Sequence, residues 1–223
     1  MIKYLLLKYR TWKYAKSQQN KIFIEGTLLN AFYKSKTIFI HIPKTAGVSL
    51  AKAIFGDVSF EGHRSFYFNS IALNIKNEKY FSFTFVRNPF DRLYSAYKFL
   101  QNGGMNHLDK LVFQTHLSEF NDFEDFILNG LNRKLIYKIT HLIPQHEYLC
   151  DKKGSILVDF VGRFEHLERD ILLLSTILSK DIKLSHHNYN KKLDYREAYT
   201  SEMINKVNQI YQKDIDIFKY TFK

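Results

Sequence analysis

The sequence has almost no cysteine and no long apolar run. Cys150 is the single cysteine among 223 residues, which excludes an intramolecular disulfide and a cysteine-rich zinc site. The fold therefore does not require an oxidising compartment. Near the N-terminus the leucines at positions 5–7 are followed by Lys8, Arg10 and Lys13, well before the roughly 20 apolar residues of a membrane-spanning helix. We expect no transmembrane segment and no standard signal peptide.

Acidic residues are outnumbered by basic ones. Asp and Glu contribute 22 residues and Lys and Arg 33, so the formal net charge is +11. This excess favours an anionic partner such as a nucleotide, a polyanionic glycan, a nucleic acid or a membrane surface, although a solvated basic surface has the same composition. Because the basic residues form no long block, we do not expect a nucleic-acid partner.

The N-terminal segment offers two interpretations. An amphipathic helix with Trp12 and Tyr14 toward lipid would make peripheral contact with a membrane. The alternative, which we favour, is a first helix that packs on the rest of the protein.

Length and composition suit one globular core. Hydrophobic residues make up 45% of the chain and charged residues 25%, which is ordinary globular usage. A chain of this length is too short for two full-sized domains to be the default. We expect a single domain over residues 1–223, with a helical lead-in over 1–36 and the core over 37–223.

Apolar, β-rich runs alternate with helical patterns along the chain. The expected strands are 37–42, 80–86 and 156–164, and the expected helices are 48–55, 89–100, 121–129, 167–178 and 201–218. Such alternation predicts an α/β fold of three layers, α/β/α, with a central parallel sheet. Ligands bind beyond the carboxyl ends of the strands in sheets of this kind. The loops that follow the first two strands are therefore the candidate site.

Two of the expected helices carry capping signals. Asn88 is a suitable N-cap, and Pro89 is a suitable first helical residue after it. The spacing of Asn121 and Glu124 is that of a capping box. We expect both helices to begin at these residues.

The first loop combines features of an anion site. It lies between a strand and a helix, where backbone N–H groups and the helix dipole stabilise an anion. Lys44 adds a mobile positive charge, Thr45 and Ser49 add hydroxyl groups, and Gly47 is flanked by small residues. Taken alone, this loop also fits an ordinary capped helix start.

The main rival for this loop is the phosphate-binding loop of nucleoside triphosphatases, with the pattern G-x-x-x-x-G-K-[ST]. That pattern places glycines before its lysine. Here no glycine of the loop precedes Lys44, and Gly47 follows it. No apolar strand ends in a clear magnesium-binding Asp. A kinase or NTPase is therefore disfavoured.

Two motifs, residues 41–49 (HIPKTAGVS) and residues 87–97 (RNPFDRLYSAY), together resemble those of one family. This family is the sulfotransferases that use 3′-phosphoadenosine 5′-phosphosulfate (PAPS), and especially their carbohydrate branch with its bacterial relatives. Residues 41–49, HIPKTAGVS, look like that family's 5′-phosphosulfate loop, and residues 87–97, RNPFDRLYSAY, look like its 3′-phosphate motif. Pro144-Gln145 and the segments 158–165 and 214–220 also resemble segments of this branch. The resemblance covers residues 38–222 and implies a P-loop-like sulfotransferase fold.

The resemblance also implies which residues bind PAPS. The expected donor-binding residues are Lys44, Thr45, Ala46, Gly47, Val48, Ser49, Arg87 and Ser95. Lys44 is also expected to act in catalysis, by neutralising charge that develops on the leaving phosphate. Arg92 is left open, as a further phosphate contact or as part of a helix-surface pair with Asp91. No metal is expected.

An acceptor hydroxyl also needs a base. His63 is the first candidate, because imidazole titrates near neutrality and a Gly-His segment lies between the two motifs in the carbohydrate branch. Glu61 is the alternative base. Arg64 and Arg163 are tentative substrate-binding residues, and Arg163 with Glu165 could instead form a buried pair. His41 is expected to be a core histidine.

The acceptor is less well specified than the donor. The resemblance implies a carbohydrate, anionic or lipid-linked, with a small-molecule acceptor as the alternative. Residues 102–138 should supply its pocket, but they carry no recognisable chemistry. The pair at positions 186–187, His-His, lacks a third metal ligand at suitable spacing. The composition is typical of an AT-rich bacterial genome, and we expect a cytoplasmic enzyme.

Overall fold

The computed structural model describes residues 2–59, 62–75, 78–184 and 194–222. The chain forms two compact units, each assembled from separate stretches of sequence. Unit 1 consists of Met1–Ile42, Ala46–Phe85 and Glu147–Ser185, and unit 2 of Pro43–Thr45, Val86–His146 and His186–Lys223. The expectation of a single domain stays a prediction.

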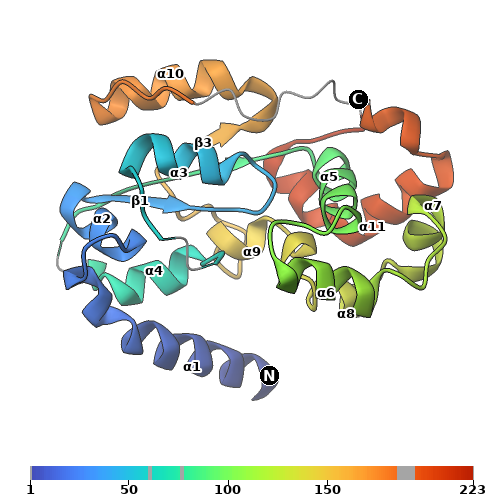
Figure 1. Ribbon diagram of the computed structural model, residues 1–223, viewed down its shortest axis with the longest axis horizontal. Coiled ribbons are helices and arrows are strands. Elements are labelled where there is room, and N and C mark those ends of the chain that lie inside the picture. Colours follow the sequence, from blue (N-terminus) through green and yellow to red (C-terminus); the bar gives the residue numbers. More distant parts are fainter. Residues whose placement is uncertain (1, 60–61, 76–77, 185–193, 223) are drawn as a thin grey trace. The chain divides into compact units, whose positions relative to one another are not determined.

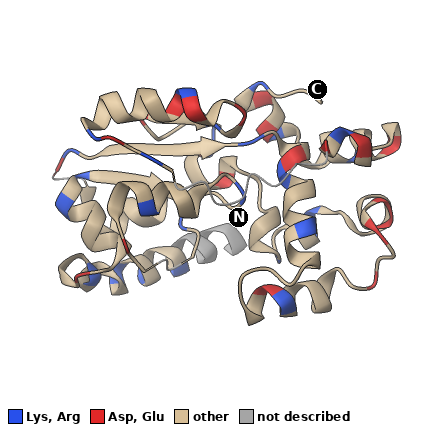
Figure 2. Ribbon diagram, turned by 45° about the horizontal axis from the view of Figure 1, so that its top comes forward, with Lys and Arg blue, Asp and Glu red and all other residues tan. Residues whose placement is uncertain are grey.

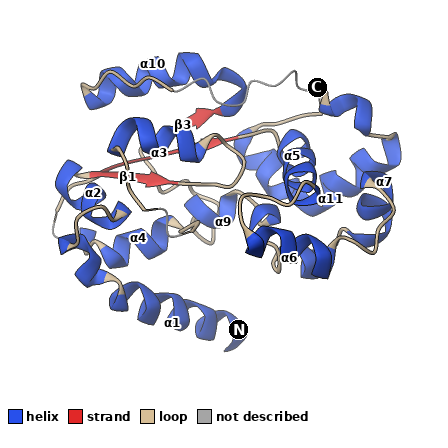
Figure 3. Ribbon diagram, in the orientation of Figure 1, coloured by secondary structure: helices blue, strands red, loops and turns tan. Residues whose placement is uncertain are grey.

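Three short strands form the sheet, in the order β1-β2-β3 (Figure 3). They are β1 (Thr37–Ile40), β2 (Phe81–Val86) and β3 (Phe160–Arg163). β1 and β2 pair in parallel, from Thr37 opposite Phe81 to Ile40 opposite Thr84. Every residue of β1 is buried, as expected of a strand covered on both faces. The first two predicted strands are confirmed.

The third strand is shorter than the predicted range of 156–164. Just before its start, Oδ2 of Asp159 accepts hydrogen bonds from both the backbone N and the Oγ of Ser82, each at 2.7 Å. The backbone N of Asp159 also donates to the backbone oxygen of Ser82, at 2.9 Å, so bonding to β2 begins one residue before Phe160. Further upstream, Ile156 pairs with Cys150 in an isolated antiparallel bridge.

Helices cover both faces of the sheet in unit 1, which confirms the three-layer α/β/α prediction. In Figure 1, α3 (Gly47–Phe55) lies on one side of β1 and α4 (Phe66–Ala72) on the other. α10 (Leu167–Leu178) contacts β3, and α1 (Ile2–Ser17) contacts α4. A 3₁₀ turn, η1 (Gln19–Phe23), connects α1 toward α2 (Leu28–Ser35), which contacts β1.

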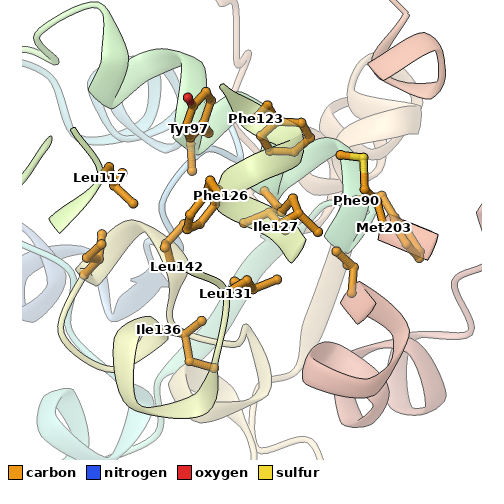
Figure 4. Close-up of a cluster of buried hydrophobic side chains, with 14 of the residues drawn as sticks. Phe90, Tyr97, Leu117, Phe123, Phe126, Ile127, Leu131, Ile136, Leu142 and Met203 are labelled. Carbon is orange, nitrogen blue, oxygen red and sulfur yellow. The ribbon is translucent and has the colours of Figure 1, made fainter. Parts of the chain in front are cut away.

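Unit 2 is helical and is built around one apolar cluster (Figure 4). Its main helices are α5 (Pro89–Gln101), α6 (His107–His116) and α11 (Ser201–Phe218). Shorter elements are α7 (Phe123–Asp125), the π-helical η3 (Phe126–Gly130), α8 (Arg133–Ile136), η4 (Thr140–Leu142) and η6 (Tyr195–Ala198). The rings of Tyr97 and Phe126 stack in the cluster, with centroids 5.4 Å apart. The predicted helices 89–100 and 201–218 are confirmed.

The remaining short helices are α9 (His146–Leu149) and η5 (Phe164–His166). Figure 2 shows Lys and Arg distributed over elements of both units, in agreement with the absence of a basic block. Across the described ranges, no helix is both long enough and apolar enough to cross a membrane.

One predicted helix start is confirmed and one is wrong. The Asn88 side chain caps α5 by accepting from the backbone N of Phe90, and Pro89 opens the helix. At the second site the cap is Asp122, whose carboxylate accepts from the backbone N of Asp125 at 2.8 Å. Asp125 in turn accepts from the backbone N of Asn121, the residue before this cap. The cap therefore lies one residue beyond the predicted one.

Candidate functional site

The loop after β1 has an unusual backbone. Lys44 has φ +70° and Ala46 has φ +62°, both in the left-handed region that costs a non-glycine residue about 1–2 kcal/mol. α3 begins at the next residue, and Ala46 accepts its first helical bond, from Leu50. Left-handed residues at a helix start occur in loops that turn backbone N–H groups toward an anion. Two left-handed residues thus lie at the start of α3, and binding of an anion by this loop stays a prediction.

Gly47 is required by the ring of His41. A Cβ atom built on Gly47 would lie 1.8 Å from Cδ2 of His41, which no real side chain tolerates. His41 is only 7% exposed and stacks on Phe39, with ring centroids 5.8 Å apart. The burial predicted for His41 is confirmed. Gly47 thus lets α3 begin directly against a core histidine of unit 1.

His63 lies against the same histidine. Its Nδ1 is 3.0 Å from the backbone oxygen of His41, and the two rings have centroids 4.3 Å apart. A carbonyl oxygen only accepts hydrogen bonds, so Nδ1 of His63 carries the hydrogen and the basic lone pair of the neutral ring is on Nε2. His63 is thereby held close to the start of α3 in the tautomer that can accept a proton at Nε2.

Two residues close to His63 in sequence, Glu61 and Arg64, were also predicted to act at the site, and the structure describes only Arg64. The Arg64 guanidinium donates to the hydroxyl of Tyr14 at 2.9 Å and lies over the rings of Tyr14 and Phe68. This arrangement links α1 to α4, and substrate binding by Arg64 stays a prediction. Glu61, the alternative base, lies outside the described residues. So does the His-His pair at 186–187.

The other donor-loop residues are exposed to different degrees. Thr45 is fully buried, Ala46 and Ser49 are half-buried, and the Val48 side chain is exposed. For Thr45 through Ser49, binding through backbone N–H groups stays a prediction.

Lys44 belongs to unit 2, where it is half-buried. Its Nζ lies 3.8 Å from the centroid of the Phe99 ring, a cation–π contact. Burial and, secondarily, the positive charge of Arg87 lower the pKa of Lys44 to about 8, against a smaller opposing effect of Asp109. The ammonium therefore loses its proton far more readily than an exposed lysine.

Arg87 connects the two motifs within unit 2. Its Nε and Nη2 donate to the two carboxylate oxygens of Asp91 at 2.7 and 2.6 Å, and its Nη1 donates to the backbone oxygen of Lys44 at 2.9 Å. Arg87 is 4% exposed. The predicted phosphate ligand is therefore held rigidly by Asp91 in the first turn of α5, and it contacts the donor loop directly.

Arg92 does not form the helix-surface pair considered for it, and its contact with phosphate stays a prediction. It is 1% exposed, and its guanidinium donates to the carbonyl oxygens of His141 and Ile143 at 3.1 and 2.7 Å. Its neighbour Asp91 pairs with Arg87 instead. Ser95 lies on α5, two turns beyond Arg87, and is half-buried. Its contact with phosphate stays a prediction.

The exposure of Glu165 excludes a buried pair with Arg163. Glu165 is exposed, whereas Arg163 is half-buried at the end of β3. The backbone N of Arg163 donates to Oδ2 of Asp170 in α10, at 2.7 Å. The tentative role of Arg163 in substrate binding stays a prediction.

Sequence reasoning missed three side chains around Lys44 and Arg87. Asp91 had a signal, since an acid four residues after an arginine on a helix forms an i,i+4 pair. Phe99 and Asp109 had none, because their effect on Lys44 depends on how separate segments pack. Within the described part of the chain, no cluster of three potential metal ligands is present.

Comparison with known proteins gives one match. A profile of the sulfotransferase family matches residues 31–221, a range that includes both motifs and the segments around residues 145 and 214. Searches among curated proteins and among solved structures found no match.

Proposed function

Since the chain belongs to the sulfotransferase family, it is an enzyme that transfers a sulfuryl group, and we propose that it moves this group from PAPS to a hydroxyl of a carbohydrate. The observation that carries the choice of donor is the bond from Arg87 to the backbone of Lys44. It joins the residue proposed for the 3′-phosphate to the residue proposed for the 5′-phosphosulfate.

Donor binding is proposed to use charge and backbone groups together. Arg87, with Ser95, binds the 3′-phosphate, which a guanidinium group attracts by its permanent positive charge. The backbone N–H groups from Thr45 to Ser49, at the start of α3, bind the oxygens of the 5′-phosphosulfate. Lys44 adds a positive charge whose pKa of about 8 keeps it mostly protonated at neutral pH.

The proposed reaction is an in-line displacement at sulfur. Nε2 of His63 accepts the proton of the acceptor hydroxyl while the acceptor oxygen forms a bond to sulfur. The bond between sulfur and the bridging oxygen breaks, and its electron pair stays on the 5′-phosphate. Lys44 stabilises that developing charge. The products are a sulfate ester and adenosine 3′,5′-bisphosphate, and the step requires no metal.

The hydrogen bond from His63 to the His41 carbonyl supports the choice of base. It fixes the ring and leaves the lone pair on Nε2. A base must be oriented as well as suitably basic. Glu61 is the alternative.

A carbohydrate acceptor that is anionic or lipid-linked is proposed from the family branch and from the net charge of +11. A cytoplasmic enzyme that acts before export of the glycan is the simplest setting. Peripheral contact with a membrane is proposed through α1. On this helix the exposed rings of Tyr9 and Trp12 stack, with centroids 6.1 Å apart, beside the exposed Arg10 and Lys13.

Two measurements test this function. The first is binding of adenosine 3′,5′-bisphosphate in the presence of a chelator, where we expect binding without magnesium and preference over ATP. The second is transfer of radiolabelled sulfuryl from PAPS to a panel of glycans and small alcohols. Lys44→Ala should abolish transfer, whereas Lys98→Ala, on the exposed face of α5, should not.

The outcomes separate the alternatives. Transfer to small alcohols alone would contradict the carbohydrate acceptor and leave the donor assignment standing. Binding that requires ATP and magnesium would overturn the donor assignment and favour a nucleotide kinase.

A further inference from the structure

The backbone of Arg87 forms two hydrogen bonds with a side chain from another part of unit 2. Oε1 of Gln145 accepts from the backbone N of Arg87 at 2.9 Å, and Nε2 of Gln145 donates to the backbone oxygen of Arg87 at 2.8 Å. Arg87 is the first residue after β2. The amide of Gln145 therefore satisfies both backbone groups at the point where the strand has ended, as a neighbouring strand would.

Gln145 is itself fixed by a buried carboxylate. Asp214 of α11 accepts from the backbone N of Gln145 at 2.7 Å and from the backbone N of His146 at 2.9 Å. Nδ1 of His146 lies 2.6 Å from the same carboxylate. Gln145 and Asp214 are both 0% exposed. Bonds to a buried charge are strong and specific in direction, so they define where the Gln145 amide lies.

Two further side chains hold the segment that carries Gln145. Arg92 donates to the carbonyls of His141 and Ile143, and the hydroxyl of Tyr211 donates to the carbonyl of Leu142 at 2.7 Å. Residues 141–146 are thus anchored from both α5 and α11. A network of buried polar groups that are all hydrogen-bonded fixes a single geometry. Through its two bonds to the Arg87 backbone, Gln145 fixes the position of Arg87 as well.

We propose that Gln145 and Asp214 are positioning residues of the donor site, which aim Arg87 at the 3′-phosphate of the nucleotide. This inference rests on the proposed function. The chain of contacts runs from Asp214 to the backbone of Gln145, from the Gln145 amide to the backbone of Arg87, and from there to the guanidinium. Asp91 and the Lys44 carbonyl orient that guanidinium from its other side.

The proposal predicts a loss of affinity that depends on the 3′-phosphate of the nucleotide. Loss of the Gln145 amide leaves the backbone of Arg87 without these two bonds, so the guanidinium loses its fixed position. Affinity for adenosine 3′,5′-bisphosphate should fall, but affinity for adenosine 5′-monophosphate, which lacks the 3′-phosphate, should not. A network that merely stabilises unit 2 would weaken both nucleotides alike.

The test is calorimetric titration of the full chain with both nucleotides, before and after Gln145→Leu. We expect the bisphosphate dissociation constant to rise about tenfold, with the monophosphate constant changed less than about twofold. Gln145→Glu keeps the acceptor for the Arg87 N–H but turns a carboxylate oxygen toward the Arg87 carbonyl, so it should give a loss of the same kind. Asp214→Asn should resemble it, and either variant decides the question if Gln145→Leu does not fold.

The matched controls lie on the exposed side of α11, where Gln212 donates to Asp216 at 2.8 Å. Gln212→Leu and Asp216→Asn make the same chemical changes and should leave both constants unchanged. Unchanged bisphosphate binding in the Gln145 variants, or equal losses for both nucleotides, would overturn the positioning role. If the unaltered protein shows no preference for the bisphosphate, the proposed function fails instead.

Discussion

Arg87 donates a hydrogen bond from Nη1 to the backbone oxygen of Lys44, at 2.9 Å. The two residues are 43 positions apart and belong to motifs that the sequence presents as independent. Their contact lies within unit 2, and it also places the positive charge of Arg87 where it lowers the pKa of Lys44. A substitution in one motif should therefore alter the properties of the other motif.

The pH dependence of transfer should report Lys44. Because its pKa is lowered to about 8, the ammonium is charged below that pH and neutral above it. If the charged form stabilises the leaving group, kcat/KM falls as the pH rises through about 8. Lys44→Arg keeps a group that stays protonated, so this alkaline limb should disappear even if the rate is lower.

The matched control for that experiment is Lys98→Arg, which makes the same change at an exposed position of α5. It should retain the alkaline limb of the unaltered enzyme. An alkaline limb that persists in Lys44→Arg would assign the titration to another group.

Asp109 offers a second test of the same charge. Its carboxylate raises the pKa of Lys44, opposing burial and Arg87. Asp109→Asn keeps an oxygen for the hydrogen bond from the backbone N of Met105 and removes the charge. The pKa of Lys44 should then fall, which moves the alkaline limb of kcat/KM to lower pH. Asp216→Asn, far along the sequence on α11, should leave it in place, and a shift to higher pH would contradict the assignment.

The elements of the fold were predictable where their signals are local. β1, β2, α3, α5, α10 and α11 follow from runs of apolar residues and from caps such as Asn88. The start of β3 was not predictable, because the bonds between Asp159 and Ser82 that lie beside it join residues 77 positions apart in the sequence. The cap at Asp122 was missed by one residue, since Asn121 and Asp122 are both suitable caps and only the backbone conformation distinguishes them.

The sequence predicts the candidate site as a set of residue types, whose roles stay predictions, and not as a set of contacts. The order of Lys44 and Gly47 excluded the nucleoside triphosphatase loop, and the second motif identified Arg87. Nothing in the sequence indicates that Phe99 lies under the Lys44 ammonium or that Gln145 holds the backbone of Arg87. Those contacts join segments 55 and 58 positions apart, and they depend on how the helices of unit 2 pack.

Any side chain at position 47 should clash with the ring of His41, and removal of that ring should relieve the clash. Gly47→Ala places Cβ 1.8 Å from the His41 ring and should lower the free energy of unfolding by about 1–3 kcal/mol, the usual cost of overpacking. His41→Ser removes the ring. We expect the double variant to be more stable than the sum of the two single changes predicts, as measured by urea denaturation. Additive effects would show that the clash is not what makes glycine necessary.

The last prediction concerns His63, whose Nδ1 is engaged by the His41 carbonyl so that proton transfer is left to Nε2. His63→Ala should lower kcat by about 100- to 10,000-fold, the usual contribution of a general base, and should leave bisphosphate affinity within about twofold. His166→Ala, at an exposed histidine of the same unit, should do neither. If His63→Ala keeps full activity, the base is a different group, and Glu61→Gln is then the variant that should lose kcat. If bisphosphate binding is lost instead, His63 belongs to the donor site, because a base for the acceptor hydroxyl has no part in holding the nucleotide.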